Sequence, residues 1–234
     1  MDRKEELKKM AGIHAAGYVK NGMKIGLGTG STVKYTIIEL GRMIEEDGLQ
    51  IIGVPTSEAT KELAESLNIP LSDLSEVKKL DLTIDGADEF DTNFHLIKGG
   101  GGALTREKIV ALASNAMIVV ADDRKKVSTL GKFPLPVEVA ISNWEEVKEK
   151  ISNICQGKVN LRMEGESPFV TDNGGYILDC NFGSIISKPD IYEKKINSIE
   201  GVVEVGLFVG ICDVVIISSL SGIQTLIKPN GRIS

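Results

Sequence analysis

Short apolar runs alternate with longer helix-like segments along residues 1–131. The apolar runs have the length of buried strands and lie at 24–28, 50–54, 80–84 and 117–121. The segments predicted as helices lie between them, at 4–20, 32–46, 57–67 and 105–114, and Thr56 or Ser57 is a candidate N-cap for the third. Strands that alternate with helices predict an α/β fold with a mainly parallel sheet covered on both faces.

The pattern changes at Lys132–Pro136, where two prolines indicate a passage into a second domain. The elements predicted beyond it are strand 135–140, helix 143–151, strand 158–163, strand 176–180, helix 189–197 and strand 202–207, with a hairpin turn at 172–175. This βαββαβ order predicts a smaller, ferredoxin-like α+β domain. Strands 213–217 and 223–227 have no partner in it, so we expect them to return to the first sheet. The predicted domains are therefore 1–131 with 208–234, and 132–207.

The net charge, the few cysteines and histidines and the short apolar stretches exclude several classes of function. The formal net charge of −6 argues against a nucleic-acid-binding surface, which needs a basic field. The three cysteines form no CxxC pair, which favours a reducing cytosol, and with only two histidines they argue against a zinc site. The longest apolar stretch, 109–121, is too short to span a membrane. We expect a soluble, cytoplasmic protein.

A glycine- and hydroxyl-rich loop, 26–32, follows the first strand. It matches neither a Walker A loop nor the dinucleotide-binding fingerprint. Its backbone N–H groups and the side chains of Thr29, Ser31 and Thr32 could still bind an anion together with Gly30. The alternative is a tight turn in which Ser31 or Thr32 caps the next helix.

An acidic segment, 85–91, follows the third strand. Asp85 and Asp88 flank a tight Gly86-Ala87 turn, so they are candidates for binding sugar hydroxyls or moving protons. The segment lacks the EF-hand pattern, although a Mg²⁺ site stays open. For Glu89 and Asp91 we expect a solvated acidic turn.

The run Lys98–Glu107 places a lysine, four glycines and a glutamate in one passage from loop to helix. Glu107 is a candidate base, or alternatively only a carboxylate that suits a helix start. Lys98 and the amides of Gly99, Gly100 and Gly101 are suited to holding an oxyanion.

The remaining charged cluster, 121–126, follows the fourth strand. Lys125 could reach a phosphate there, and the alternative is a solvated charged turn. His14 and His95 are interpreted as structural.

In combination, these motifs resemble the type A ribose-5-phosphate isomerases. The matching segments, in order, are GLGTGST (26–32), DGADEFD (85–91), KGGGGALTREK (98–108), ADDRKKV (121–127), GKFPLPVEV (131–139), VTDNGGYILD (170–179) and GVVEVGLF (201–208). The resemblance implies a Rossmann-like domain with a ferredoxin-like insertion, assembled as a homodimer or a dimer of dimers. It implies interconversion of ribose 5-phosphate and ribulose 5-phosphate in the pentose phosphate pathway, without a metal or organic cofactor.

The resemblance also implies roles for the matching positions. Glu107 would be the general base that moves a proton between C1 and C2 through a cis-enediolate. Asp85 would assist ring opening, and Asp88 and Lys98 would orient the hydroxyls and stabilise the enediolate. The further substrate contacts would come from Thr29, Gly30, Ser31, Thr32, Gly86, Ala87, Gly99, Gly100, Gly101 and Lys125.

Two other functions stay open. A non-catalytic sugar-phosphate sensor would keep the glycine loop and the lysines but would need no base. A CoA-transferase-like enzyme would use a glutamate as an acyl carrier.

Overall fold

The computed structural model describes residues 3–183 and 185–232, and these form two compact units. Unit 1 comprises residues 1–87, 106–125 and 211–234, and unit 2 comprises residues 88–105 and 126–210. Residues 1, 2, 184, 233 and 234, which the predicted domains include, lie outside the described residues.

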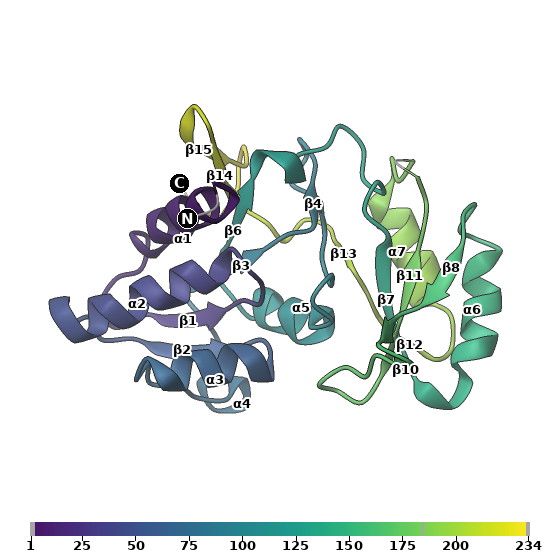
Figure 1. Ribbon diagram of the computed structural model, residues 1–234, viewed down its shortest axis with the longest axis horizontal. Coiled ribbons are helices and arrows are strands. Elements are labelled where there is room, and N and C mark those ends of the chain that lie inside the picture. Colours follow the sequence, from purple (N-terminus) through teal and green to yellow (C-terminus); the bar gives the residue numbers. More distant parts are fainter. Residues whose placement is uncertain (1–2, 184, 233–234) are drawn as a thin grey trace. The chain divides into compact units, whose positions relative to one another are not determined.

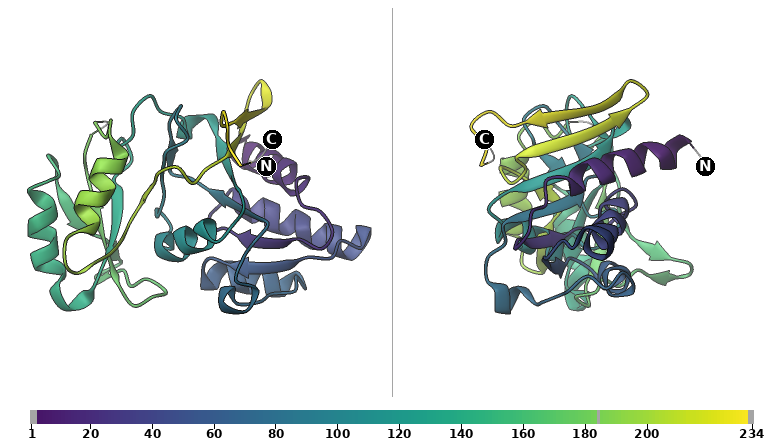
Figure 2. Two further views of the ribbon diagram at one scale, coloured as in Figure 1. Left: turned by 180° about the vertical axis from the view of Figure 1, so that it is seen from behind. Right: turned by 90° about the vertical axis from the view of Figure 1, so that its left-hand side faces the viewer.

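Unit 1 contains a six-stranded sheet in the order β15-β14-β6-β3-β1-β2. The strands are β1 (Lys24–Leu27), β2 (Ile52–Pro55), β3 (Leu82–Gly86), β6 (Met117–Asp122), β14 (Val214–Ser219) and β15 (Gly222–Ile227). All neighbouring pairs are parallel except β14 with β15, which form an antiparallel hairpin. The α/β fold class with a mainly parallel sheet is confirmed, and the last two strands join the first sheet as expected (Figures 1 and 2).

Helices cover both faces of this sheet. They are α1 (Arg3–Ala16), α2 (Val33–Asp47), α3 (Glu58–Ser66), α4 (Leu74–Val77) and α5 (Leu104–Leu112), the last of which begins in unit 2 and continues in unit 1. Small residues of α1 such as Ala11 and Ala15 pack with the apolar face of α2 onto every second residue of β1, β3, β6 and β14. The opposite face packs against α5, where Val110 joins Val54 and Leu80.

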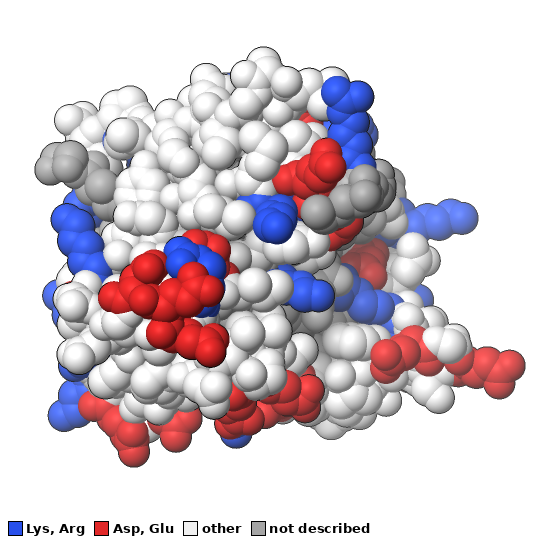
Figure 3. Space-filling model, turned by 60° about the vertical axis from the view of Figure 1, so that its left-hand side comes forward, with Lys and Arg blue, Asp and Glu red and all other residues white. Residues whose placement is uncertain are grey.

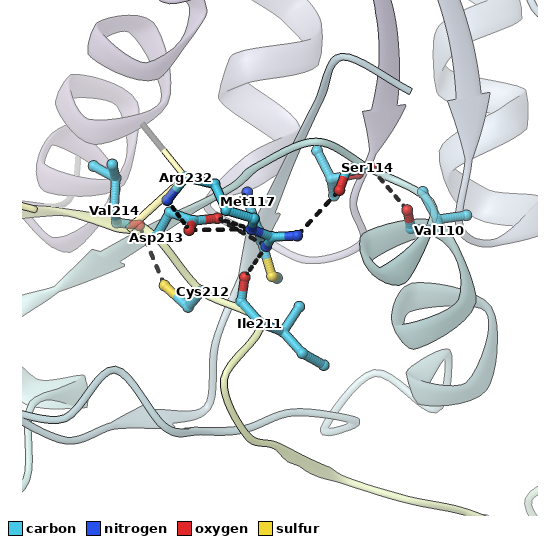
Figure 4. Close-up of polar contacts among 9 residues, drawn as sticks. Val110, Ser114, Met117, Ile211, Cys212, Asp213, Val214 and Arg232 are labelled. Carbon is cyan, nitrogen blue, oxygen red and sulfur yellow. Dashed lines mark hydrogen bonds and ion pairs between the residues drawn. The ribbon is translucent and has the colours of Figure 1, made fainter. Parts of the chain in front are cut away.

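The C-terminal segment of unit 1 is held by an ion-pair cluster (Figure 4). The Arg232 guanidinium donates to Asp213 at 2.8 Å and also to the backbone carbonyls of Ser114 and Ile211. The buried Asp213 carboxylate in turn accepts the N–H of Met117, at the start of β6. These contacts connect the end of the chain to the amino ends of β6 and β14 and to the end of α5.

Unit 2 is built on an antiparallel sheet in the order β12-β7-β11-β8. Its elements are β7 (Leu135–Val139), α6 (Trp144–Ser152), β8 (Val159–Leu161), β11 (Tyr176–Cys180), α7 (Pro189–Asn197) and β12 (Val202–Val205). A short hairpin of β9 (Met163–Glu164) and β10 (Ser167–Pro168) lies between β8 and β11. The predicted βαββαβ order is present, and the apolar sides of α6 and α7 pack on the sheet around Val137 and Leu178.

A second small sheet, in the order β13-β5-β4, explains why residues 88–105 belong to unit 2 rather than to the predicted first domain. Its strands are β4 (Glu89–Phe90), β5 (Leu96–Ile97) and β13 (Leu207–Phe208). In addition, the Glu89 carboxylate accepts the N–H groups of Gly131 at 2.8 Å and Phe133 at 2.5 Å, which keeps residues 126–131 with unit 2. The predicted boundaries at 131 and 208 therefore differ from those of the compact units.

The expectation of a solvated turn at Glu89 and Asp91 is wrong. Both carboxylates are buried, with 3% and 8% of their surface exposed. Glu89 binds the two N–H groups described above, and Asp91 accepts the N–H groups of Asn93 and His95 and contacts His95 Nδ1 at 3.0 Å. Both carboxylates can be buried because backbone N–H groups supply the hydrogen bonds that water would otherwise make.

Candidate functional site

In unit 1, the predicted site residues gather where three neighbouring parallel strands end. The order β6-β3-β1 places the carboxyl ends of these strands side by side. Thr29–Thr32 follow β1, Asp85 and Gly86 end β3, and Lys125 ends the 3-10 helix Asp123–Lys125 after β6. The chain leaves β1 toward β2 on one side and later passes from β3 to β6 on the other. This change of direction is the switch point at which open α/β sheets bind ligands.

Asp85 is fully buried at this switch point and holds the loop after β1. Its Oδ1 accepts the N–H of Thr29 at 3.0 Å and the N–H of Gly86 at 2.7 Å. A Cβ on Gly28 would lie 2.3 Å from the Asp85 carboxylate, so only glycine allows this approach. The structure therefore brings together two of the predicted residues, Thr29 and Asp85.

A cluster of hydroxyl groups supports the same loop from the start of α3. Thr29 Oγ1 lies 2.7 Å from Thr56 Oγ1 and donates to Ser57 Oγ at 2.8 Å. Thr60 Oγ1 donates to the Gly28 carbonyl at 2.9 Å, and Ser57 accepts the Thr60 N–H as the N-cap of α3. Sequence reasoning identified the cap but missed the cluster; its signal is the concentration of hydroxyls at 56, 57 and 60.

The capping alternative for Ser31 and Thr32 is not what the structure shows. The helix α2 begins at Val33, and the Thr32 side chain makes no capping hydrogen bond among the described residues. Ser31 and Gly30 are exposed, with Gly30 at a φ of +132°. Ser31 and Thr32 thus lie at the N-terminus of a 15-residue helix, where an anion is favoured.

Glu107 lies in the first turn of α5 and is 4% exposed. A carboxylate that only balances the helix dipole is normally solvated, so its burial favours a functional role over the helix-start alternative. On the same helix the apolar Ile109 and Leu112 are exposed. Leu104 and Val110 of α5 are buried as usual, so the helix buries Glu107 while leaving two of its apolar residues exposed.

In unit 2, Asp88 and the glycine run contact each other. Asp88 is half-buried, and its Oδ2 accepts the Gly100 N–H at 2.7 Å. A Cβ on Gly100 would come within 2.5 Å of Asp88 Oδ1. The Gly102 N–H closes a turn onto the Gly99 carbonyl at 2.9 Å. One of the three amides predicted to hold an oxyanion, that of Gly100, thus donates to Asp88.

Lys98 lies directly before this turn and is 2% exposed. Its backbone N–H donates to the Gly206 carbonyl at 2.9 Å, and its Nζ lies 5.5 Å from the centroid of the buried Phe208 ring. A buried ammonium group is expensive to retain without a use, which is typical of functional lysines.

The cluster after β6 is only partly solvated. Asp122 is buried and receives the Arg124 guanidinium through two bonds of 2.8 Å. Burial by itself would raise the pKa of Asp122, but the hydrogen bond and charge of Arg124 outweigh it and lower that pKa. Lys125 is half-buried beside this pair, and Asp123 and Arg124 are exposed.

The described residues outside these clusters offer little further chemistry. They contain no group of three or more metal-ligating side chains. None of their helices combines the length and the apolar character that crossing a membrane requires. On the face drawn in Figure 3, basic and acidic side chains are interspersed. His95 contacts Asp91, and His14 packs edge-on against Tyr18.

Comparison with known proteins identifies the family. Residues 52–222 match the family model described as ribose 5-phosphate isomerase A (phosphoriboisomerase A). The chain belongs to the ribose 5-phosphate isomerase A family. It is 50% identical to ribose-5-phosphate isomerase A 1 of Oceanobacillus iheyensis, across 95% of this chain and 99% of that protein.

Solved structures agree with this family. Ribose 5-phosphate isomerase A from Methanocaldococcus jannaschii has a TM-score of 0.91 and 43% identity, covering 96% of this chain and all of that one. A D-ribose-5-phosphate isomerase in complex with phospho-erythronic acid has a TM-score of 0.92 and 41% identity, covering 95% of this chain and 98% of that one. The resemblance predicted from the motifs is confirmed.

Proposed function

We propose that the protein is an aldose–ketose isomerase that interconverts D-ribose 5-phosphate and D-ribulose 5-phosphate. The observation that carries the proposal is the buried carboxylate of Glu107 at the start of α5, in a chain that belongs to the isomerase A family. Proton transfer at carbon needs a base shielded from water, and few other roles justify burying a helix-start glutamate.

In the proposed reaction, Glu107 removes the proton from C2 of the open-chain aldose. The electron pair moves toward the C1 carbonyl and gives a cis-enediolate. The hydroxyl proton of O2 passes to O1, and the proton on Glu107 returns to C1 as the C2–O bond becomes the carbonyl, which produces the ketose without net oxidation. Asp85 assists ring opening and proton transfer at the sugar oxygens.

Lys98 and the glycine run supply the stabilising charge. The C–H next to a carbonyl is a weak acid, so the enediolate oxygens need preorganised donors. We assign this role to the Lys98 ammonium and to amides of the run 99–101. Asp88 orients sugar hydroxyls and, through Gly100, the run itself.

The phosphate is assigned to the loop after β1 and to Lys125. Ser31 and Thr32 offer hydroxyls at the N-terminus of α2, and the helix dipole favours a dianion there. Thr29 acts mainly through its N–H to Asp85 and its inward-facing hydroxyl. Gly86 and Ala87 complete the proposed contacts as the backbone between the two aspartates.

The proposed chemistry uses no metal and no organic cofactor. A cytoplasmic location and assembly as a homodimer or dimer of dimers, which the resemblance implies, stay proposals beside it.

The deciding experiment is a ribose 5-phosphate isomerase assay of the wild-type protein with and without a chelator, repeated for Glu107→Gln. We expect chelator-independent activity, and a loss of at least about 10³-fold in kcat for E107Q with unchanged folding, since removing a catalytic base removes the proton acceptor. Glu65→Gln, on the exposed side of α3, is the matched control and should leave kcat unchanged.

Deuterium exchange separates isomerisation from mere binding. In D₂O the wild type should introduce solvent deuterium at the carbon that is protonated, whereas a sugar-phosphate sensor would introduce none. Near-normal kcat in E107Q would remove Glu107 as the base, and absence of turnover and exchange in the wild type would reject the isomerase.

A further inference from the structure

The guanidinium group of Arg162, the residue between β8 and β9, contacts the glycine run. Its Nη1 donates to the carbonyl of Gly99 at 2.9 Å and to the carbonyl of Gly100 at 3.1 Å. Its Nε and Nη2 form a two-pronged ion pair with Asp179 of β11, at 3.0 and 2.6 Å. Only 15% of the Arg162 side chain is exposed.

Two carbonyl contacts determine the direction of two amides. A peptide unit is planar and trans, so fixing the carbonyl of one residue aims the N–H of the next residue the opposite way. By holding the Gly99 and Gly100 carbonyls, Arg162 therefore aims the N–H groups of Gly100 and Gly101 away from itself. The first of these reaches Asp88 at 2.7 Å, as this geometry requires.

Glycine makes this external support necessary. Consecutive glycines have many backbone conformations of similar energy, so the run needs contacts beyond its own turn bond, from the Gly102 N–H to the Gly99 carbonyl, to orient its peptide planes. The first plane is held at both ends, by Arg162 and by Asp88. In the second peptide plane, which joins Gly100 to Gly101, Arg162 contacts the Gly100 carbonyl.

Arg162 is itself fixed in place. The Asp179 carboxylate sets the plane of the guanidinium, because the bidentate pair allows one relative orientation. Its Cζ lies 5.8 Å from the centroid of Phe169, whose ring occupies the space that a Cβ on Gly102 would fill. The pair thus forms a rigid support built on β8 and β11, rather than a surface ion pair.

We propose that Arg162, oriented by Asp179, is a positioning residue that aims the Gly100 and Gly101 amides of the glycine run. Resting on the proposed function, this means that Arg162 prepares the Gly101 amide as a donor for the developing enediolate and keeps the Gly100 amide on Asp88, without contacting the substrate. A lysine at position 162 could replace the positive charge of the arginine but not its planar set of N–H donors.

The test compares Arg162→Gln, Arg162→Lys and Asp179→Asn with the wild type. We expect kcat to fall about 10- to 100-fold in R162Q, less than the 10²–10³ typical of deleting an oxyanion donor outright. KM should change less than roughly threefold, because ground-state binding is mostly retained. R162K should recover only a small part of kcat, and D179N should show a weaker version of the R162Q defect. Arg42→Gln, which breaks a surface ion pair of α2, is the matched control.

Amide hydrogen exchange gives a readout that does not depend on turnover. Amide exchange at residues 99–102 should be faster in R162Q and D179N than in the wild type and R42Q. The exchange rates in the strands of unit 2 should stay unchanged. If R162Q does not fold, D179N carries both measurements.

The outcomes are separable from those of the proposed function. An active wild type with unchanged kcat in R162Q, or full recovery in R162K, overturns the positioning role and leaves the isomerase intact. Unchanged exchange at 99–102 overturns it as well, even if the wild type proves inactive on ribose 5-phosphate.

Discussion

Individual side chains show where this protein tolerates unfavourable burial. Asp85, Lys98 and Glu107 are 0%, 2% and 4% exposed, although each has a side chain that is normally charged. Burying a charge costs several kcal/mol unless the surroundings compensate. Such a cost is retained where the charge is needed in a water-poor environment, which makes these three residues candidates for chemistry.

The substitution Lys98→Met tests whether the buried ammonium group is needed for catalysis. Methionine keeps the length of the alkyl chain beside Phe208 but removes the ammonium, so the enediolate loses a proposed cationic donor. We expect kcat for ribose 5-phosphate to fall by about 10²–10³, the range for losing such a donor. A thermal melt should show that K98M is still folded at the assay temperature, so that the loss of kcat is a loss of chemistry.

Steady-state kinetics and a thermal melt together check this result. Lys61→Met, on the exposed side of α3, is the control for the substitution itself. Full kcat in K98M, or activity lost only together with the folded state, would show that Lys98 has a structural role.

Residue types and their order could be read from the sequence, but their partners could not. The pairing of an acidic turn with a lysine–glycine–glutamate run was enough to nominate Asp85 and Glu107. The burial of Glu89 was not predicted, because its partners lie more than 40 positions away, at Gly131 and Phe133. The role of Arg162 was not predicted for the same reason, since a single arginine forms no sequence motif and its partners are distant along the chain.

Among the helices and strands, those with a strong local sequence signal were predicted most accurately. Strand β11 and helix α7 have the predicted bounds, 176–180 and 189–197, because a turn signal and a proline mark where they begin. The two-residue strands β4 and β13 were not predicted as separate strands, because two residues show no periodicity. The predicted strand 158–163 ends at Leu161, and the chain then enters the hairpin that carries Arg162 and Phe169.

The start of α3 offers a test at this scale. In Ser57→Ala, the Thr60 N–H loses its cap and the Thr29 hydroxyl loses one acceptor. We expect the free energy of unfolding to fall by about 0.5–2 kcal/mol, as for other N-cap deletions. Urea denaturation measures it, with Ser66→Ala as the control because that exposed hydroxyl only donates within its own helix. A change no larger than that of the control would show that the hydroxyl cluster adds no stability.

For the whole molecule, the sequence predicted the return of the last two strands but not the division into units. The return follows from elimination, since a βαββαβ unit is complete without β14 and β15. The division depends on long-range pairs such as β4 with β5 and β13, which assign residues 88–105 to unit 2. Such pairs depend on the register of the folded chain.

The three cysteines test the integrity of both cores at once. Cys155 and Cys180 lie in the core of unit 2 and Cys212 in unit 1, and each thiol donates to a backbone carbonyl. Burial raises the pKa of all three thiols above their ordinary value of 9.0. The neighbouring Cys155 and Asp179 raise the pKa of Cys180 further, and Asp213 does the same for Cys212. The thiolate is the reactive form, so the folded protein should react slowly with a disulfide reagent at mildly alkaline pH, whereas the unfolded chain should react at all three thiols.

The sign of the pH effect follows from the same shifts. Because the folded thiols keep their protons above the pH at which the unfolded thiols lose them, the folded state binds more protons there. The free energy of unfolding contributed by these groups is therefore fully present below pH 9 and decreases as the pH rises through and beyond it. Denaturation at a series of pH values should show this decline, and Cys155→Ser should reduce it while leaving Cys180 and Cys212 protected. A thiol that reacts in the native protein as fast as in a small peptide would contradict its burial, and would locate the core that opens first.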